Sequence, residues 1–277
     1  MDSAAAANTR LIRVAGLARS GNHAIINWIL RQMPGRWAFL NCVQARTNPF
    51  LTARPDDDGR RWSASYPDFA PAAELAGVHT PRHALLIGME DTFLRPAFGP
   101  AGTQVTLRAV GGAAQIVDVV VLRDPYNLFA SRSRLNGALL PGPQALRVWK
   151  QHARAHLGEV RGLARPVLAA NFNRWAGSPA YRADLARRLE LDFTDAGRDE
   201  IARCGGGSSF DGLTLHGAAR RMDIAGRWRH FAGRDGFGAI FDRETVGLAR
   251  RLFPDIAEQV EAGGLVSRRD RPSRLVV

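Results

Sequence analysis

The sequence contains very little lysine. Lys150 is the only lysine among 277 residues, yet 38 basic side chains against 26 acidic ones give a formal net charge of +12. Arginine therefore carries almost all of the positive charge, and its planar guanidinium binds phosphate and sulfate oxygens in pairs. This balance favours an anionic partner such as a nucleotide, an acidic glycan, nucleic acid or a membrane surface. A coding bias toward arginine and alanine explains the excess equally well, so charge alone does not choose among these partners.

Cysteines and long apolar runs are also scarce. The two cysteines, Cys42 and Cys204, form no Cys-x-x-Cys pair, which argues against a disulfide framework and a metal cluster. Residues 1–10 lack the apolar core of a signal peptide, and no run of about 18 apolar residues is present to form a transmembrane helix. We therefore expect reduced cysteines and a soluble, cytoplasmic protein without a membrane span.

The rest of the composition is that of an ordinary globular protein. Apolar residues make up 45% of the chain, which is enough for a sizeable core. The length suits one large α/β domain, and we expect a single domain over residues 1–277 with loose ends at 1–10 and 267–277.

Short β-rich runs alternate with helical patterns along the chain, which predicts an α/β fold with a parallel β-sheet flanked by helices. The run 116–122 is apolar throughout, as in strands that are buried on both faces. The stretch 48–81 lacks periodicity and is expected to be a long excursion near a functional face. Strands are predicted at 11–16, 84–89, 116–122 and 166–170, and helices at 25–33, 143–158, 179–191 and 244–253.

A glycine-flanked loop connects the first predicted strand to the first helix. Backbone N–H groups converge at such a turn, and the helix N-terminus adds partial positive charge, so an anion can bind there. Arg19 would add a full cation, and Ser20 and Asn22 would add hydrogen-bond donors. The loop reads Gly16-Leu17-Ala18-Arg19-Ser20-Gly21-Asn22-His23.

The loop has the GxxxxG spacing of a Walker A motif but lacks the Lys-Ser/Thr pair that follows it, because Asn22 and His23 stand there. That hydroxyl normally holds magnesium beside the phosphates. Its absence argues against an ordinary ATPase or kinase, and a GxGxxG dinucleotide fingerprint does not fit either. Taken alone, the segment is also compatible with a strand-to-helix turn that binds nothing.

A second candidate anion site follows the buried strand 116–122. Arg123 leaves the carboxyl end of that strand, where ligands of open α/β sheets bind, and its guanidinium can hold a phosphate. Ser131 lies about two turns into the next helix, which Asp124 can cap and Pro125 can open. The alternative is that Arg123 simply pairs with Asp124.

The two motifs and their order resemble the 3′-phosphoadenylyl-sulfate-dependent sulfotransferases. In that family, a loop similar to Arg19-Ser20-Gly21 holds the 5′-phosphosulfate. A later strand that ends in Arg-Asp-Pro, with a serine eight residues on, holds the 3′-phosphate, and Arg123 and Ser131 match it residue for residue. The resemblance covers residues 11–231 and implies a three-layer sandwich like that of P-loop NTPases. Arg19 makes it closer to carbohydrate-type than to cytosolic aryl-type members, many of which have lysine there.

Two further segments extend the resemblance. Residues 221–230 are similar to a late loop of the family that closes over the 3′-phosphate: Arg221 stands at its leading arginine, and Gly226, Trp228 and Arg229 match its Gly-x-Trp-basic element. Phe172 lies where the family often places an aromatic side chain near the adenine. The predicted cofactor-binding residues are Gly16, Arg19, Ser20, Gly21, Asn22, His23, Arg123, Ser131, Phe172, Arg221, Gly226 and Arg227.

The resemblance implies metal-free transfer of a sulfuryl group from 3′-phosphoadenylyl sulfate to a hydroxyl, for instance of a carbohydrate or another small molecule, or to an amine. Arg19 is the predicted stabiliser of charge at the bridging oxygen. Glu90, at the end of a predicted strand, is the predicted general base. Glu90 or its neighbour Asp91 could instead cap a loop or pair with an arginine, and His23, His79 and His83 are rival bases. Trp62 is a candidate for stacking against the acceptor.

Three other hypotheses stay open. A small-molecule kinase-like P-loop transferase would need ATP and magnesium, and the missing Lys-Ser/Thr pair argues against it. A nucleic-acid-binding protein would show aromatic-studded basic patches or a known reading motif, and neither is found in the sequence. A catalytically inactive nucleotide-binding scaffold would keep the anion sites and lack the base. The sequence indicates neither the acceptor nor the oligomeric state.

Overall fold

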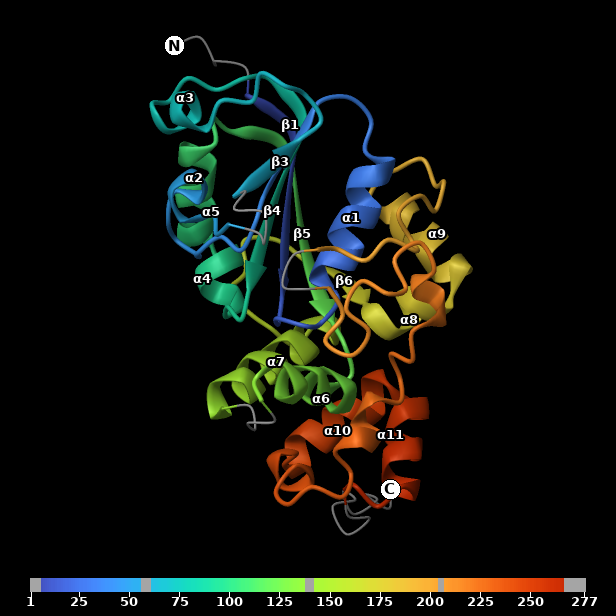
Figure 1. Cartoon of the computed structure of the whole chain (residues 1–277). Helices are drawn as coiled ribbons and strands as arrows, with labels where there is room; N and C mark the ends of the chain where they lie inside the picture. The colour runs from blue at the N-terminus through green and yellow to red at the C-terminus, as the bar shows by residue number, and fades with distance from the viewer. Residues whose placement is uncertain (1–5, 56–60, 138–141, 204–206, 267–277) are drawn as a thin grey trace.

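The computed structural model describes residues 6–55, 61–137, 142–203 and 207–266, and the strands within them form one six-stranded sheet (Figure 1). The strand order is β3-β2-β4-β1-β5-β6, and neighbours are parallel except that β3 pairs antiparallel with β2 at one edge. The α/β class with a mainly parallel sheet, predicted from the sequence, is confirmed. The strands are β1 (Asn8–Gly16), β2 (Trp37–Leu40), β3 (Trp62–Ala64), β4 (Arg82–Glu90), β5 (Ala113–Leu122) and β6 (Leu168–Asn171).

Helices cover both faces of the sheet. In Figure 1, α1, α8 and α9 lie on one side of it, and α2, α4 and α5 lie on the other. Alternate residues of β1 build both layers, because successive side chains of a strand point to opposite faces. Ile12 and Val14 pack in a buried cluster with α1 and α9, whereas Leu11 and Ala15 pack with α4. These helices are α1 (Asn22–Gln32), α2 (Pro49–Thr52), α3 (Pro71–Leu75), α4 (Leu94–Phe98), α5 (Pro100–Ala109), α8 (Phe172–Gly177) and α9 (Pro179–Arg188).

A third hydrophobic cluster lies at the lower end of Figure 1, where the helices after β5 meet those near the C-terminus. Phe129, Trp149 and Phe237 are completely buried in it. The Trp149 indole also donates to the backbone carbonyl of Arg123 at 2.9 Å, so the cluster fixes the chain directly after β5. Its helices are α6 (Pro125–Leu135), α7 (Pro143–His156), α10 (Arg243–Leu252), α11 (Pro254–Ala262) and the short 3-10 helices η2 (Arg227–His230) and η3 (Gly238–Ile240). A further 3-10 helix, η1 (Ala219–Arg221), precedes η2 in the chain.

The strand register brings several predicted site residues to one edge of the sheet. Gly16 at the end of β1 is paired with Glu90 at the end of β4. Leu122, which precedes Arg123, is paired with Asn171, which precedes Phe172. Since parallel strands share their carboxyl edge, four separate parts of the chain meet there.

The structure also contains elements that the sequence patterns did not reveal. β2 and the pair α4–α5 were not expected, and the irregular stretch 48–81 includes the short elements α2, β3 and α3. Pro254 was expected only to stop a helix, but it also opens α11, since proline is favoured at a first helical position. The N-terminal loose end was expected to reach residue 10, but β1 already begins at Asn8. The other expected loose end, 267–277, lies outside the described residues.

A buried ion pair crosses from β1 to β5 beneath the site. The Arg13 guanidinium donates to both carboxylate oxygens of Asp118 at 2.7 and 2.8 Å, and both side chains are at most 1% exposed. Its remaining donors reach the carbonyl of Ala97 and the hydroxyl of Thr103. Arg165 adds a second contact to Asp118 at 3.1 Å. The pair is fully hydrogen-bonded, which is what burial of two charges requires.

We expect Asp118→Ala to destabilise the protein strongly, because it leaves the Arg13 guanidinium buried without its carboxylate. Removing one partner of a buried pair costs about 3–5 kcal/mol. Denaturant unfolding measures the loss. Asp68→Ala is the matched control, since it removes the exposed partner of Arg36 and should change the midpoint little. Equal effects of the two substitutions would contradict this account of the core.

Candidate active site

A pocket with a volume of about 1080 Å³ opens at the carboxyl edge of the sheet. It is larger than the roughly 300–1,000 Å³ of a usual small-molecule site. The loop after β1, the ends of β4 and β5, the start of α8 and the segment before η2 all contribute to its walls. The predicted site residues that line it are Arg19, Gly21, Asn22, His23, Glu90, Arg123, Phe172 and Arg227.

The other predicted site residues have different positions. Gly16, Ser20, Ser131 and Gly226 are not part of the lining but lie in or next to the segments that form it. Arg221 is exposed on η1 and outside the lining, whereas its neighbour Arg220 contributes to it. The structure therefore brings together most, but not all, of the predicted set.

Two glycines allow the loop after β1 to approach its neighbours closely. Gly21 has a φ of 92°, and a Cβ atom there would lie 2.2 Å from the Phe172 ring. At Gly16 a Cβ atom would lie 1.9 Å from Oδ1 of Asn22. Arg19 itself adopts a left-handed φ of 74°, which is uncommon for a non-glycine residue and occurs often at functional sites.

Asp91 ties this loop to the end of β4. Its backbone N–H donates to Gly16 at 3.0 Å, and its carboxylate accepts from the Ala18 N–H at 3.3 Å and from Arg132 at 2.6 Å. Sequence reasoning gave Asp91 only the alternative roles of loop cap and arginine partner, both of which it has here, and gave Arg132 no role. The only signal in the sequence was position. Asp91 directly follows Glu90, the predicted base, and Arg132 directly follows Ser131. They hold the loop in place.

Two buried guanidinium groups converge on one hydroxyl at the end of β5. Arg123 and Arg227 each donate to Oγ of Ser131, at 3.2 and 3.1 Å. The Ser131 hydroxyl in turn donates to the carbonyl of Asn127 at 2.8 Å. Arg123 and Arg227 are 2% and 6% exposed, so two positive charges are held close together away from bulk water.

The electrostatics of this cluster are unfavourable without an anion. Burial, together with the nearby charge of Arg227, lowers the pKa of Arg123 to about 9. Burial lowers the pKa of Arg227 to about 10, although Asp211 opposes the shift. Groups that are buried against like charge with such shifts are typical of ligand sites. An anion between the two guanidinium groups would relieve both effects.

Asp124 is engaged elsewhere, which weakens the alternative in which it serves as the partner of Arg123. Its carboxylate accepts from the backbone N–H of Asn127 at 2.8 Å, capping α6. It also accepts from the side-chain amides of Asn127 and Asn173. Burial raises the pKa of Asp124, and the nearby charge of Arg123, followed by these hydrogen bonds, partly offsets the rise.

An aromatic wall stands beside the two arginines. The Phe172 and Trp175 rings are stacked, with centroids 5.8 Å apart and an interplanar angle of 20°. Arg123 lies over the Phe172 ring at 5.5 Å. Both rings line the pocket, and sequence reasoning had given Trp175 no role there. Trp28 packs edge-on against Trp175 from the core side.

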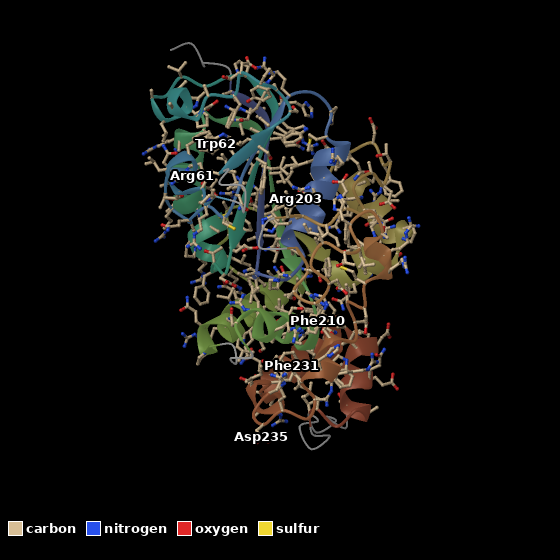
Figure 2. All side chains as sticks on the ribbon, in the orientation of Figure 1. Arg61, Trp62, Arg203, Phe210, Phe231 and Asp235 are labelled. Carbon is tan, nitrogen blue, oxygen red and sulfur yellow. The ribbon has the colours of Figure 1, made fainter. Side chains whose placement is uncertain are left out.

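Figure 2 shows that Trp62 lies far from the glycine-rich loop that carries Phe210. Trp62 belongs to β3 and packs edge-on against Phe69, outside the pocket lining. Phe210 lies below the guanidinium of Arg227, at 5.1 Å. The glycine-rich segment 207–212 therefore contributes to the arginine site, whereas residues 204–206 lie outside the described part of the chain.

Glu90 faces the pocket at the end of β4. One of its carboxylate oxygens accepts from the Asn22 side-chain amide at 3.1 Å, and the other accepts from the Cys42 thiol at 3.5 Å. Nδ1 of His23 lies 3.9 Å from Oε1. Asn22 therefore links this carboxylate to the loop after β1.

The three rival histidines are separated by the structure. His23 lines the pocket beside Glu90. His79 bonds the buried carboxylate of Glu74, and neither His79 nor His83 lines the pocket. Of the described residues, His23, Cys42 and Glu90 also form a group of potential metal ligands.

No protein-family model and no curated protein sequence matches this chain. Among solved structures, the sulfotransferase domain of the olefin synthase from Synechococcus PCC 7002 is similar, with 16% identity, a TM-score of 0.52 and coverage of 87% of this chain and 94% of that one. The mouse sulfotransferase SULT7A1, solved with PAP, has 12% identity, a TM-score of 0.45 and coverage of 92% and 89%. At these identities the likeness concerns the fold, and the fold is that of a sulfotransferase domain.

Within the described residues, no helix has both the length and the apolar character needed to cross a membrane.

We expect sulfate to raise the melting temperature near neutral pH, because it would bind between the two buried guanidinium groups of the folded state. The effect should fade as the pH passes about 9 to 10, where Arg123 and Arg227 lose their protons while sulfate keeps its charge. Thermal unfolding with and without sulfate, at constant ionic strength, measures this.

Arg123→Met should remove the sulfate effect, and Arg187→Ala, which changes an exposed arginine bonded to Asp184, should keep it. A sulfate effect that survives in Arg123→Met would show that the anion binds elsewhere.

Proposed function

We propose that this protein is a sulfotransferase that uses 3′-phosphoadenylyl sulfate as its donor. The observation that carries the proposal is the pair of buried arginines on Ser131, which share one pocket with a separate anion-binding loop after β1. Two anion sites in one pocket suit a nucleotide with phosphate groups at both its 3′ and 5′ positions. The sulfotransferase-type fold supports this assignment.

The donor would bind across the carboxyl edge of the sheet. Arg123, Arg227 and Ser131 would hold the 3′-phosphate, since forked guanidinium groups match phosphate oxygens. The loop 16–22 and the N-terminus of α1 would hold the 5′-phosphosulfate. The adenine would lie by the stacked rings of Phe172 and Trp175, which present an apolar face to the pocket.

The transfer would follow an in-line displacement. An acceptor oxygen forms a bond to sulfur as the bond from sulfur to the bridging phosphate oxygen breaks. Arg19 would stabilise the negative charge that develops on that leaving oxygen. Glu90 would take the acceptor proton. The products are a sulfate ester and adenosine 3′,5′-bisphosphate, and the proton later passes to solvent.

The acceptor would enter from the side of the pocket that contains Glu90. This side is lined by His23, Asn41, Cys42 and Arg54. Polar side chains around the base suit a small molecule with a hydroxyl group, including a carbohydrate. Arg19 in place of the lysine of many cytosolic members supports a carbohydrate-type acceptor.

The first prediction of this proposal is that adenosine 3′,5′-bisphosphate binds tightly without magnesium. Each of its two phosphates would bind at its own cationic site. AMP and ATP have no 3′-phosphate, so they should bind more weakly. Isothermal titration calorimetry measures all three ligands in the presence of a chelator. Arg123→Ala should abolish the advantage of the bisphosphate over AMP, because it removes one arm of the 3′-phosphate site.

The Arg187→Ala variant again serves as the control and should bind like the unchanged protein. A preference for ATP with magnesium would overturn the proposal and favour the kinase-like transferase. Tight bisphosphate binding without transfer to any acceptor would identify the inactive scaffold.

The second prediction concerns the base. Glu90→Gln should lower kcat by on the order of 10²–10⁴, the usual contribution of a general base, with bisphosphate affinity nearly unchanged. Transfer of radiolabelled sulfuryl groups to an acceptor found in a panel of hydroxyl compounds measures turnover.

Glu244→Gln, on an exposed carboxylate paired with Lys150, is the control and should behave like the unchanged protein. If His23→Gln abolishes turnover while Glu90→Gln retains it, His23 is the base instead.

A further inference from the structure

Three side chains of different metal-binding types meet on the acceptor side of the pocket. The ligand atoms of His23, Cys42 and Glu90 all lie within 4.8 Å of one another. They come from the start of α1, the loop after β2 and the end of β4, so the fold brings together residues that are distant in sequence. Imidazole, thiolate and carboxylate are the three ligand classes that zinc uses in proteins.

A fourth residue orients the imidazole for ligation. Nε2 of His23 lies 2.8 Å from Oδ1 of Asn41, where it donates its proton. In the neutral ring this leaves the lone pair on Nδ1, the nitrogen that faces Glu90 at 3.9 Å. Metal-binding histidines usually donate their other N–H to such an oxygen, which fixes the tautomer and the ring direction.

The spacing of the group suits a tetrahedral ion. Sulfur at about 2.3 Å and oxygen at about 2.0 Å from one tetrahedral zinc ion stand about 3.5 Å apart. The Cys42 sulfur lies 3.5 Å from Oε2 of Glu90. Nδ1 of His23 lies 3.9 Å from the other carboxylate oxygen, Oε1, so the imidazole and the carboxylate must close in for the three ligands to share one ion. Cys42 also has a left-handed φ of 46°, an uncommon conformation for a residue with a side chain.

The charges also balance. A Cys42 thiolate and the Glu90 carboxylate together neutralise a divalent ion, and the neutral imidazole completes a set of three ligands. All three residues are half-buried and line the pocket, so the fourth position of the ion would face the pocket. Three protein ligands with one open position are the arrangement of zinc sites that bind an exchangeable water or ligand.

We infer that His23, Cys42 and Glu90 form a binding site for a divalent transition metal of the zinc class, oriented by Asn41. Binding releases the thiol proton of Cys42 to solvent. The metal would engage the Glu90 carboxylate, so it would block sulfuryl transfer. This consequence for activity rests on the proposed role of Glu90 as the base, but the metal site itself does not.

The test is a titration of the metal-free protein with Co²⁺ and then with Zn²⁺ as competitor. We expect one equivalent of Co²⁺ to bind with a thiolate-to-cobalt absorption band, which Zn²⁺ then removes. X-ray absorption of the unchanged protein with Zn²⁺ should show one sulfur ligand among nitrogen and oxygen ligands. This readout does not depend on any variant folding correctly.

The variants identify the ligands. Cys42→Ser should lose the band, while Cys204→Ser, which changes the other cysteine of the chain, should keep it. Asn41→Ala should weaken binding by about 10–100-fold, the usual effect of removing the partner of a metal-bound histidine. Thermal unfolding confirms that each variant is folded.

The inference is overturned if the unchanged protein binds no stoichiometric metal, if the band survives Cys42→Ser, or if Cys204→Ser removes it. Nucleotide binding is measured in chelator, and metal binding is measured without nucleotide. Failure of one proposal is therefore distinguishable from failure of the other. If both hold, Zn²⁺ should inhibit transfer, and a chelator should restore it.

Discussion

The pocket depends on one unfavourable arrangement: two arginine side chains buried beside the same hydroxyl. Arg123 and Arg227 both donate to Ser131, and burial lowers the pKa of each. Folding alone does not favour such a cluster, because two desolvated like charges repel each other. The surrounding structure holds it in place through Trp149, which fixes the Arg123 backbone, and through Asn127, which accepts from Ser131. This arrangement is the one that the proposed 3′-phosphate site would use.

The loop after β1 is built on a different principle. Its cationic group, Arg19, is partly exposed, and the loop shape depends on Gly16, Gly21 and the anchoring carboxylate of Asp91. One anion site thus relies on buried full charges, and the other relies on backbone N–H groups and a helix terminus. The side chain of Asn22, which belongs to this loop, donates a hydrogen bond to Glu90. The position of the Glu90 carboxylate therefore depends on the conformation of the loop.

Sequence patterns predicted the sheet class and the main strands, and most of the predicted site residues line the pocket, because strand ends and glycine loops are locally encoded. They did not reveal β2, whose residues show no distinctive pattern, or α11, since Pro254 both ends one helix and begins the next. Trp175 could not be told from a core tryptophan. The Asn41 and Cys42 contacts to His23 and Glu90 depend on packing between segments far apart in the chain, which no local pattern encodes.

The position of Arg227 in the chain has a consequence for biosynthesis. The Arg123 guanidinium donates to the carbonyl of Ile224, which follows it by 101 residues. A ribosome adds about 5–20 residues per second, so for several seconds the nascent chain carries Arg123 without the segment that later encloses it. The central strands can pair in that interval, but the pocket cannot close until the last helices have emerged. A nucleotide could therefore assist only the final stage of maturation, after translation is nearly complete.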